Sequence, residues 1–245
     1  MTLSRWIKYY IYIVIQRIIP QKVLIFFASS TTTEKIRKSF FRPKGHSEIY
    51  TKKINYFNFS LTISCPLQVL IKAENNGIEP SLSRLIMNEI QLGDHCIDIG
   101  AHYGFITLIM AKMAGEQGYV YSFESDSNIS VILTKNIESN NLNQRCSTQN
   151  YFISNISNDT MKIIDDIFNQ NNNKIKLIKI DTDGSDYNCL LGAEKLIHRD
   201  MPLIIIEMSE NAQKIHQKLC SFGYEYYYDQ YYNSINYEEY PINLI

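Results

Sequence analysis

The chain has few cysteines, and their arrangement excludes two kinds of stabilising site. The five cysteines are scattered, and no two of them form a Cys-x-x-Cys pair. An odd, dispersed set argues against a disulfide framework and against a structural zinc site. The sequence therefore predicts reduced thiols in a cytosolic protein, with Cys96 as a small core residue of an apolar strand.

Long uninterrupted apolar runs are also missing. The stretch from Trp6 to Phe27 is strongly apolar, but Arg17, Pro20 and Lys22 interrupt it. It falls short of the roughly 18 to 20 apolar residues of a membrane span, and no small-residue cleavage site follows it, which argues against a cleaved signal peptide. Two interpretations stay open: a helix packed on the domain or on a second subunit, and a basic amphipathic helix on an anionic membrane surface.

Charge is divided unevenly along the chain, although the formal net charge is only −1. Residues 1–60 hold eleven Lys or Arg against two Glu, a net charge of +9, whereas thirteen basic and twenty-three acidic residues follow. The polar residues 31–47 contain Pro and Gly, as linkers do. We therefore predict a basic, aromatic N-terminal arm with its linker over 1–53 and one acidic α/β domain over 54–245.

Hydrophobic periodicity predicts the order of elements in that domain. Residues 54–72 predict two short strands, and 81–90 a helix that leads into the core. Five strands (96–99, 119–123, 149–153, 176–180 and 203–207) then alternate with five helices (105–113, 127–139, 161–168, 187–198 and 212–221). This order favours a doubly wound, mainly parallel sheet with sites at the carboxyl ends of its strands. The tyrosine-rich tail predicts a closing antiparallel hairpin.

The turn after the first of these strands lacks the Gly-x-Gly-x-x-Gly pattern of dinucleotide sites. It contains only Gly100 and Gly104, and Asp98 lies just before it. A carboxylate there would repel a pyrophosphate, but it suits a cationic, amino-bearing ligand such as S-adenosylmethionine (SAM). Glu124, after the second strand, is placed to accept both ribose hydroxyls. We therefore expect SAM as the cofactor; the alternative is a glycine pair that serves only the turn.

Several motifs follow one another at the ends of the predicted strands. They are residues 93–104, Phe123-Glu124, Ile164-Asp165-Asp166, residues 179–186, Leu191-Gly192-Ala193, Ile206-Glu207 and Phe222-Gly223-Tyr224. In this order they resemble the FkbM-type methyltransferases over residues 93–228, and upstream Glu79-Pro80 resembles an acid that the family keeps loosely. The resemblance implies a Rossmann-like class I methyltransferase sheet and SAM-dependent methylation of an oxygen, often on a sugar or another secondary metabolite. The residues expected to hold SAM are Asp98, Gly100, Ala101, His102, Gly104, Glu124 and Ser125.

The chain departs from the family pattern at four positions. It has His102 where Asn is usual, Ser125 where Pro is usual, and Asp183 and Asp186 where glutamates are usual. An aspartate side chain is shorter than a glutamate side chain by about one carbon–carbon bond, so its carboxylate lies that much farther from the ligand. Reacting groups tolerate errors of only about 1 Å in their position. Cofactor binding is therefore favoured more strongly than activity, and a SAM-binding, membrane-peripheral protein without turnover stays the alternative.

Methyl transfer is an in-line displacement, so the protein mainly aligns the acceptor and removes its proton. Asp181, which ends the fourth core strand, is the expected base or acceptor contact, with Asp183 and Glu207 as alternatives. Helix capping is the competing explanation for Asp183 and Asp186. His102 lies in the turn itself, where it either reaches the ligand or faces solvent. A divalent metal held by this acid cluster stays an open alternative, but the Asp-x-Asp-Gly-x-Asp spacing does not match an EF-hand loop, so we assign no metal ligands.

The expected partner is a small-molecule or carbohydrate acceptor rather than nucleic acid. Enzymes that methylate the amino group of a flipped base have Asp/Asn-Pro-Pro-Tyr where this chain has Asp-Thr-Asp-Gly. The chain has no Pro-Cys pair for attack on cytosine C5, and its acidic catalytic half disfavours phosphate backbones. We therefore expect a cytoplasmic enzyme, with association to a membrane surface or to a second copy through the arm left open.

Overall fold

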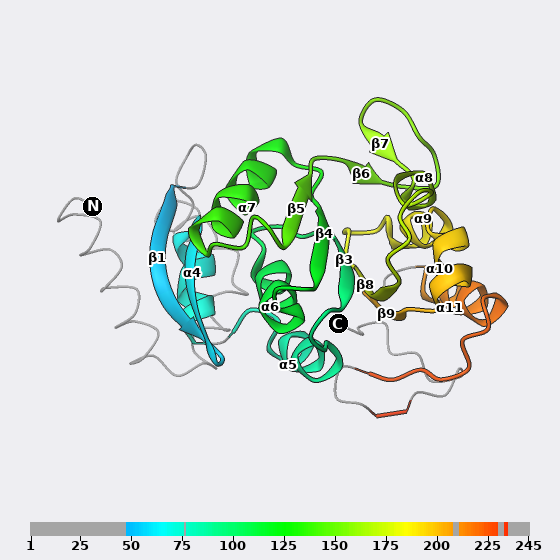
Figure 1. The fold of residues 1–245 in the computed structure, drawn as a ribbon, viewed down its shortest axis with the longest axis horizontal. Helices are drawn as coiled ribbons and strands as arrows, with labels where there is room; N and C mark the ends of the chain where they lie inside the picture. Colours follow the sequence, from blue (N-terminus) through cyan, green and yellow to red (C-terminus); the bar gives the residue numbers. More distant parts are fainter. Residues whose placement is uncertain (1–47, 76, 208–210, 230–232, 235–245) are drawn as a thin grey trace, which may run out of the picture.

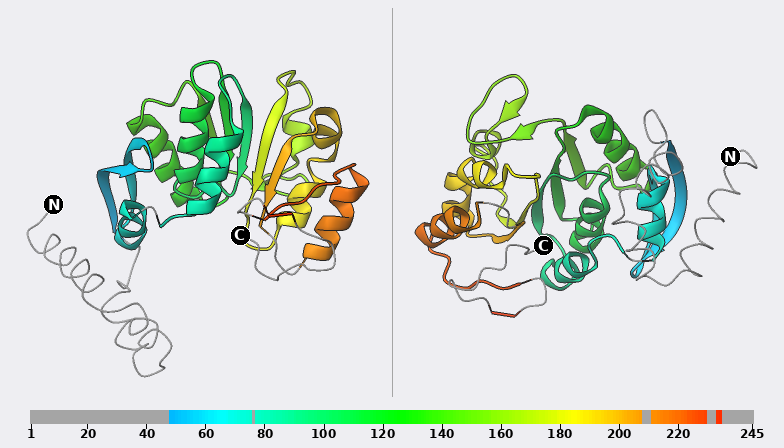
Figure 2. Two further views of the ribbon diagram at one scale, coloured as in Figure 1. Left: turned by 90° about the horizontal axis from the view of Figure 1, so that it is seen from below. Right: turned by 180° about the vertical axis from the view of Figure 1, so that it is seen from behind.

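The computed structural model describes residues 48–75, 77–207, 211–229 and 233–234. In chain order its elements are β1 (Ile49–Tyr56), β2 (Phe59–Pro66), α4 (Leu67–Glu74), α5 (Pro80–Glu89), β3 (His95–Ile99), α6 (Phe105–Ala114), β4 (Tyr119–Phe123), α7 (Ser127–Ser139), β5 (Cys146–Gln149), β6 (Phe152–Ile153), β7 (Met161–Lys162), α8 (Ile164–Ile167), β8 (Ile175–Ile180), α9 (Asp186–Leu191), α10 (Glu194–Asp200), β9 (Leu203–Ile206) and α11 (Ala212–Ser221). The central sheet lies between two helical layers, with β1, β2 and α4 outside one of them (Figures 1 and 2). Most of the predicted N-terminal arm lies outside the described residues.

The central sheet has five strands in the order β5-β4-β3-β8-β9, and every pairing is parallel. Side chains alternate between its two faces. Cys96 of β3 packs with α5, α6 and α7, whereas Ile97 and Ile99 pack with α8 to α11. Both faces are therefore covered, as parallel strands require. This confirms the predicted doubly wound α/β sheet and the buried position of Cys96.

The antiparallel pair β1–β2 is held against α7 by amide side chains. Asn136 donates to the Ser64 carbonyl (2.9 Å) and accepts from the Ser64 amide (2.7 Å). Asn140, one turn later, makes the same two bonds with Thr62 (2.7 and 3.0 Å). Because Thr62 and Ser64 are alternate residues of β2, the two asparagines satisfy backbone groups at the open edge of this strand.

The two strands predicted within 54–72 are present as β1 and β2 but lie earlier in the chain, and the third core strand also has other bounds. Residues 67–71 form the start of helix α4, because Leu70, Ile71 and Ala73 bury one helical face. The third core strand, predicted over 149–153, is β5 over Cys146–Gln149, which shares only Gln149 with the predicted range. Asn150 ends β5, since its side chain donates to the carbonyls of Glu124 and Ser125.

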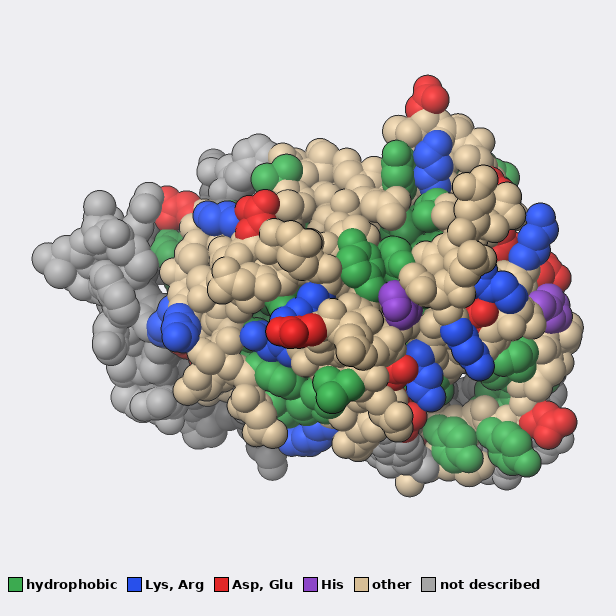
Figure 3. Space-filling model, viewed as in Figure 1, with side chains coloured by type: hydrophobic (Ala, Val, Ile, Leu, Met, Phe, Trp, Pro, Cys, Tyr) green, Lys and Arg blue, Asp and Glu red, His purple; other side chains and the backbone are tan. Residues whose placement is uncertain are grey.

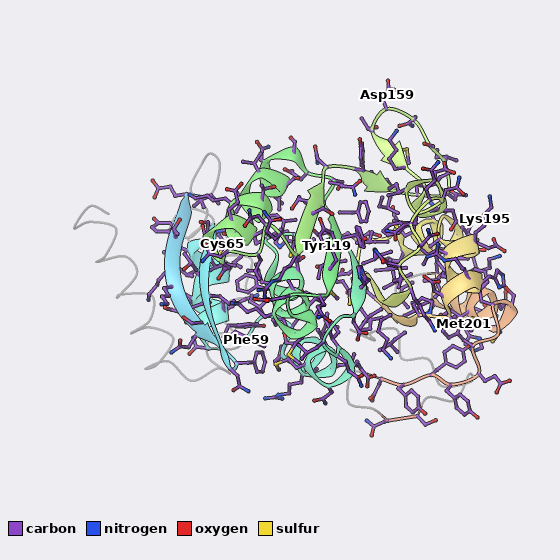
Figure 4. All side chains as sticks on the ribbon, viewed as in Figure 1. Phe59, Cys65, Tyr119, Asp159, Lys195 and Met201 are labelled. Carbon is purple, nitrogen blue, oxygen red and sulfur yellow. The ribbon has the colours of Figure 1, made fainter. Side chains whose placement is uncertain are left out.

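Two of the predicted helices also differ from the structure. Met161 and Lys162 do not begin a helix but pair with β6 as strand β7, so α8 covers only residues 164–167. The loop between β6 and β7, with Asp159 at its tip, extends away from the sheet (Figure 4). The helix predicted over 187–198 is divided at Gly192, where a Cβ atom would lie 2.2 Å from the Ser154 carbonyl oxygen. The Asp165 carboxylate then accepts the amides of Lys195 and Leu196 at the start of α10.

The tyrosine-rich tail forms little regular structure in the described residues. One antiparallel bridge joins Tyr228 and Ser234, whereas Tyr224, Tyr226 and Tyr227 lie in no strand, contrary to the predicted hairpin; the remaining tail tyrosines lie outside the described residues. In the described part of the chain, no helix has the length and apolarity to cross a bilayer. Acidic and basic side chains are interspersed over the face in Figure 3. Each cysteine is free, and Cys220 is the exposed one.

Candidate active site

A cavity of about 600 Å³ lies where β3, β4 and β8 end. Its lining includes most of the residues that the sequence singled out, namely Gly100, Ala101, His102, Gly104, Glu124, Ser125, Asp181 and Asp183. Asp98 and Glu207 are not among its lining residues. The structure therefore brings together the glycine turn, the acid after β4 and the acids after β8, as sites at the carboxyl edge of a parallel sheet require.

The glycine turn is fixed by the two strands beside it. The amides of Gly100 and Ala101 both donate to the Phe123 carbonyl at 3.0 Å. Gly104 has φ +86° and begins helix α6, where a Cβ atom would lie 2.4 Å from the Leu133 side chain. Glycine is required at both ends of this turn, since left-handed backbone and close packing coincide there.

Glu124 is a buried anchor of this turn, with 7 % exposure. One of its carboxylate oxygens accepts the His102 amide at 2.8 Å, and the other accepts the Asp126 amide at 2.9 Å. Each oxygen keeps a second lone pair for a ligand hydroxyl. The geometry thus allows the ribose contact that the sequence predicts, which stays a prediction.

Asp98 lies beneath the turn rather than in the cavity. Its side chain is fully buried and accepts the Thr107 hydroxyl at 2.6 Å. Its other oxygen lies 3.4 Å from Lys179 Nζ. Lys179 also donates to the Gly100 carbonyl at 2.9 Å. Asp98 and Lys179 together support the underside of the glycine turn.

Lys179 joins this support to the acid at the end of β8. Its Nζ atom lies 3.3 Å from Asp181 Oδ2. Burial alone would lower the pKa of Lys179. The charges of Asp98, Asp181 and Glu79 outweigh that effect and raise its pKa above the ordinary value, so the buried lysine is a cation.

Asp181 has a second acidic neighbour, Glu207, which directly follows β9. The two side chains share a hydrogen bond, which raises the pKa of Glu207 to about 7. Burial and the nearby charges of Asp181, Asp186 and Asp183 add to this shift. Two adjacent carboxyl groups that share a proton can relay it, which suits acid–base chemistry.

The loop after Asp181 is closed by Asp186, which is 1 % exposed. Its carboxylate accepts the Thr182 amide (2.9 Å), the Thr182 hydroxyl (3.0 Å) and the Gly184 amide (3.3 Å). These groups belong to the loop before helix α9 and not to its first turn, so Asp186 holds this loop and does not cap the helix, which the competing explanation had expected. Asp183 is exposed at the cavity rim.

Three residues of the cavity wall have left-handed backbone although they are not glycine. They are Glu79 (φ 43°), His102 (φ 51°) and Asp183 (φ 50°). Such conformations are costly and gather at functional sites. Desolvation of its ring lowers the pKa of His102, and the charge of Glu124 opposes this shift.

Sequence reasoning missed several residues of this site. Lys179 lies in an otherwise apolar strand, and a lysine is rarely buried without an acidic partner. This charged residue at a buried strand position could have indicated a buried ion pair. Glu79 attracted notice only through the resemblance. The aromatic residues Tyr151 and Phe152 line the cavity beside Glu124, and only the tertiary fold reveals this.

Comparison with known proteins gives one family match. Residues 147–226 match the family described as the methyltransferase FkbM domain. The match covers β5 to β9 and most of the following segment, including the acids after β8, and it confirms the resemblance seen in the sequence over these residues.

Individual relatives are distant. A protein-L-isoaspartate O-methyltransferase from Triticum aestivum is 27 % identical over 105 residues, which are 43 % of this chain and 41 % of that protein. The chain thus spans about two fifths of the length of this curated relative. A methyltransferase FkbM structure from Methylobacillus flagellatus KT has 19 % identity and a TM-score of 0.45, covering 52 % of this chain and 37 % of that one. A SAM-dependent O-methyltransferase from Thermotoga maritima has 15 % identity and a TM-score of 0.45, covering 77 % and 65 %.

Proposed function

From the FkbM methyltransferase domain matched over residues 147–226, we propose that this chain binds SAM and transfers its methyl group to a hydroxyl oxygen. The observation that carries the proposal is the cavity in which Glu124 and Asp181 follow β4 and β8, the two strands that flank β3 and its glycine turn. One acid would hold the nucleoside, and the other would meet the acceptor.

The cofactor half of the site would be formed by β3 and β4. The ribose hydroxyls would donate to the Glu124 carboxylate, and the adenine would lie against the rings of Tyr151 and Phe152. The negative carboxylates around the cavity favour the cationic sulfonium over a phosphate-bearing cofactor.

The chemical step would be an in-line displacement at the methyl carbon. The acceptor oxygen forms a bond to that carbon as the carbon–sulfur bond breaks, so the sulfonium becomes the neutral thioether of S-adenosylhomocysteine (SAH). The hydroxyl proton passes to the Asp181 carboxylate, which Lys179 and Glu207 hold in place. The acceptor that we propose is a small hydroxylated molecule or carbohydrate, and the arm over residues 1–53 would contact a membrane surface or a second copy.

Two measurements test the proposal. Calorimetry on the full chain should show SAM binding, and incubation with methyl-labelled SAM and a panel of hydroxylated acceptors should transfer label to one of them. A folded protein that does not bind SAM would contradict the proposal. If SAM binds but every acceptor stays unlabelled, the protein without turnover becomes the better description.

A further inference from the structure

The carboxylate that the sequence assigned to the cationic ligand is not available to it. Asp98 is fully buried, it accepts the Thr107 hydroxyl, and its second oxygen faces Lys179. It is absent from the lining of the cavity. A ligand ammonium would have to displace Lys179 to reach it, and this would leave a buried lysine without its partner.

Glu79 differs from Asp98 in reaching the cavity; Asp98 Oδ1 is also buried without a hydrogen-bond partner in the described part of the chain, but it faces Lys179 Nζ at 3.4 Å. Glu79 lines the cavity, and its Oε2 atom is buried with no hydrogen-bond partner among the described residues. A buried carboxylate oxygen without a donor is costly unless a ligand completes it.

The backbone around Glu79 is held firmly in this costly arrangement. Glu79 has φ 43° and precedes Pro80, and its carbonyl accepts the Ser83 amide at 2.9 Å. The hydroxyl of Tyr56, a fully buried residue of β1, donates to the Ile78 carbonyl and lies 3.1 Å from the Ser83 hydroxyl. These contacts hold the backbone on both sides of Glu79 in place, at the point where its side chain reaches the cavity.

The charge at this end of the cavity favours a cation. Glu79 and Asp181 both lie close enough to Lys179 to raise its pKa. The ammonium of Lys179 is already engaged by Asp98, Asp181 and the Gly100 carbonyl. The carboxylates of Glu79, Asp98 and Asp181 therefore outnumber the buried ammonium of Lys179 beside the glycine turn.

We infer that Glu79, not Asp98, is the counter-ion of the α-ammonium group of bound SAM. The inference rests on the proposed function, because it assigns the amino-acid half of the same ligand. It places the nucleoside against Glu124 and the methionine part against Glu79, with the glycine turn between them.

Three ligands and two variants test the inference on the full chain. SAM and SAH both carry the ammonium, whereas methylthioadenosine has the nucleoside and thioether but no amino-acid group. Glu79→Gln keeps the size of the side chain and removes its charge. Glu89→Gln, at the far end of the helix that Glu79 precedes and outside the cavity lining, is the matched control. Calorimetry gives the dissociation constant for each combination of protein and ligand.

We expect Glu79→Gln to reduce the affinity for SAM and for SAH by the same factor, about tenfold or more, because a charged hydrogen bond becomes a neutral one. Methylthioadenosine should bind equally to the wild type and to both variants, which also shows that Glu79→Gln is folded. Unchanged SAM and SAH affinity in Glu79→Gln would overturn the inference, and so would a loss confined to SAM, which would indicate contact with the sulfonium. If the wild type binds none of the three, the proposed function itself fails.

Discussion

The carbonyl oxygen of Asp181 lies so close to Gly100 that a Cβ atom on this glycine would stand 1.8 Å from it. The relationship connects the turn after β3 to the end of β8, the two segments that we assign to the cofactor and to the acceptor. No side-chain rotation can relieve a contact between two backbones. The spacing of the two halves of the site is therefore set by the absence of a side chain at Gly100.

Gly100→Ala should consequently unfold more easily than a substitution at another left-handed glycine. Gly223 has φ +96° with nothing within 4 Å of the added Cβ, so Gly223→Ala carries only the backbone penalty of about 1 to 2 kcal/mol. Gly100→Ala adds the clash with Asp181, and we expect a loss of at least about 3 kcal/mol in the free energy of unfolding. Urea denaturation of both variants measures the difference. Equal losses would show that the turn can move away from β8.

Glu124 should matter for the nucleoside half of the ligand. Glu124→Gln removes the charge that we expect the ribose hydroxyls to face, and a hydrogen bond to a charged group is worth about 1.5 to 3 kcal/mol. The affinities for SAM and for methylthioadenosine should both fall, by about tenfold to a hundredfold. The matched control is Glu116→Gln on the surface, where Glu116 pairs with Arg145. Calorimetry that finds methylthioadenosine unaffected by Glu124→Gln would refute the ribose assignment.

The sequence predicted the parallel sheet well because buried strands leave a strong periodic signal. β3, β4 and β8 lie inside the sheet, and their apolar runs agree with the structure. β5 lies at an edge and is more polar, so the apolar residues 151–153 that follow it moved the predicted strand to 149–153. The positions of Asn150 and Gly192 depend on contacts with residues far away in the chain, which a local pattern does not contain.

The candidate site was predictable in part, for a similar reason. Glycines and acids at the strand ends can be identified from position alone, so Gly100, Glu124 and Asp181 were anticipated. Whether an acid faces the cavity or a buried partner depends on the third dimension. Asp98 was therefore expected in the cavity, although its carboxylate points to Thr107 and Lys179.

The amide side chains between β2 and α7 should be unequal in their effect on stability. Asn136 is fully buried, and it also donates to the Tyr103 carbonyl at 2.9 Å, so its loss leaves buried groups of Ser64 and Tyr103 unpaired. At about 1 to 3 kcal/mol per unpaired buried group, Asn136→Leu should cost at least about 3 kcal/mol. Asn140→Ala should cost only about 1 kcal/mol, because water reaches the half-buried Thr62. Chemical denaturation in which the two variants lose equal stability would contradict this account.

Glu207 should make stability depend on pH. Its pKa is raised from 4.5 to about 7, above all by the hydrogen bond with Asp181. Between these values the folded protein binds more protons than the unfolded chain, so the free energy of unfolding should fall as the pH rises from about 4.5 to 7. Glu207→Gln keeps a hydrogen-bond donor for Asp181 and removes the titration. Denaturation at several pH values should therefore show the wild type losing stability relative to Glu207→Gln over this range, and parallel curves would rule out a shifted Glu207.

Asp181→Asn should slow methyl transfer without weakening SAM binding. Asp181→Asn keeps the shape of the side chain but cannot accept the proton of the acceptor. Lys179 retains Asp98 and the Gly100 carbonyl as partners, so the fold and the SAM affinity should change little. Removal of a positioned base costs about 10² to 10⁴ in rate, and we expect kcat to fall by that factor once an acceptor is known.

The control for this variant is Asp159→Asn, which removes an acid at the tip of the loop between β6 and β7 (Figure 4). It should bind SAM and turn over like the wild type. Wild-type turnover in Asp181→Asn would show that this carboxylate is structural, and attention would move to Glu207 or Asp183. A loss of SAM affinity equal to the loss of rate would instead indicate that Asp181 holds the cofactor. Removing an interaction that is made only in the transition state lowers the rate but leaves the affinity for the cofactor unchanged.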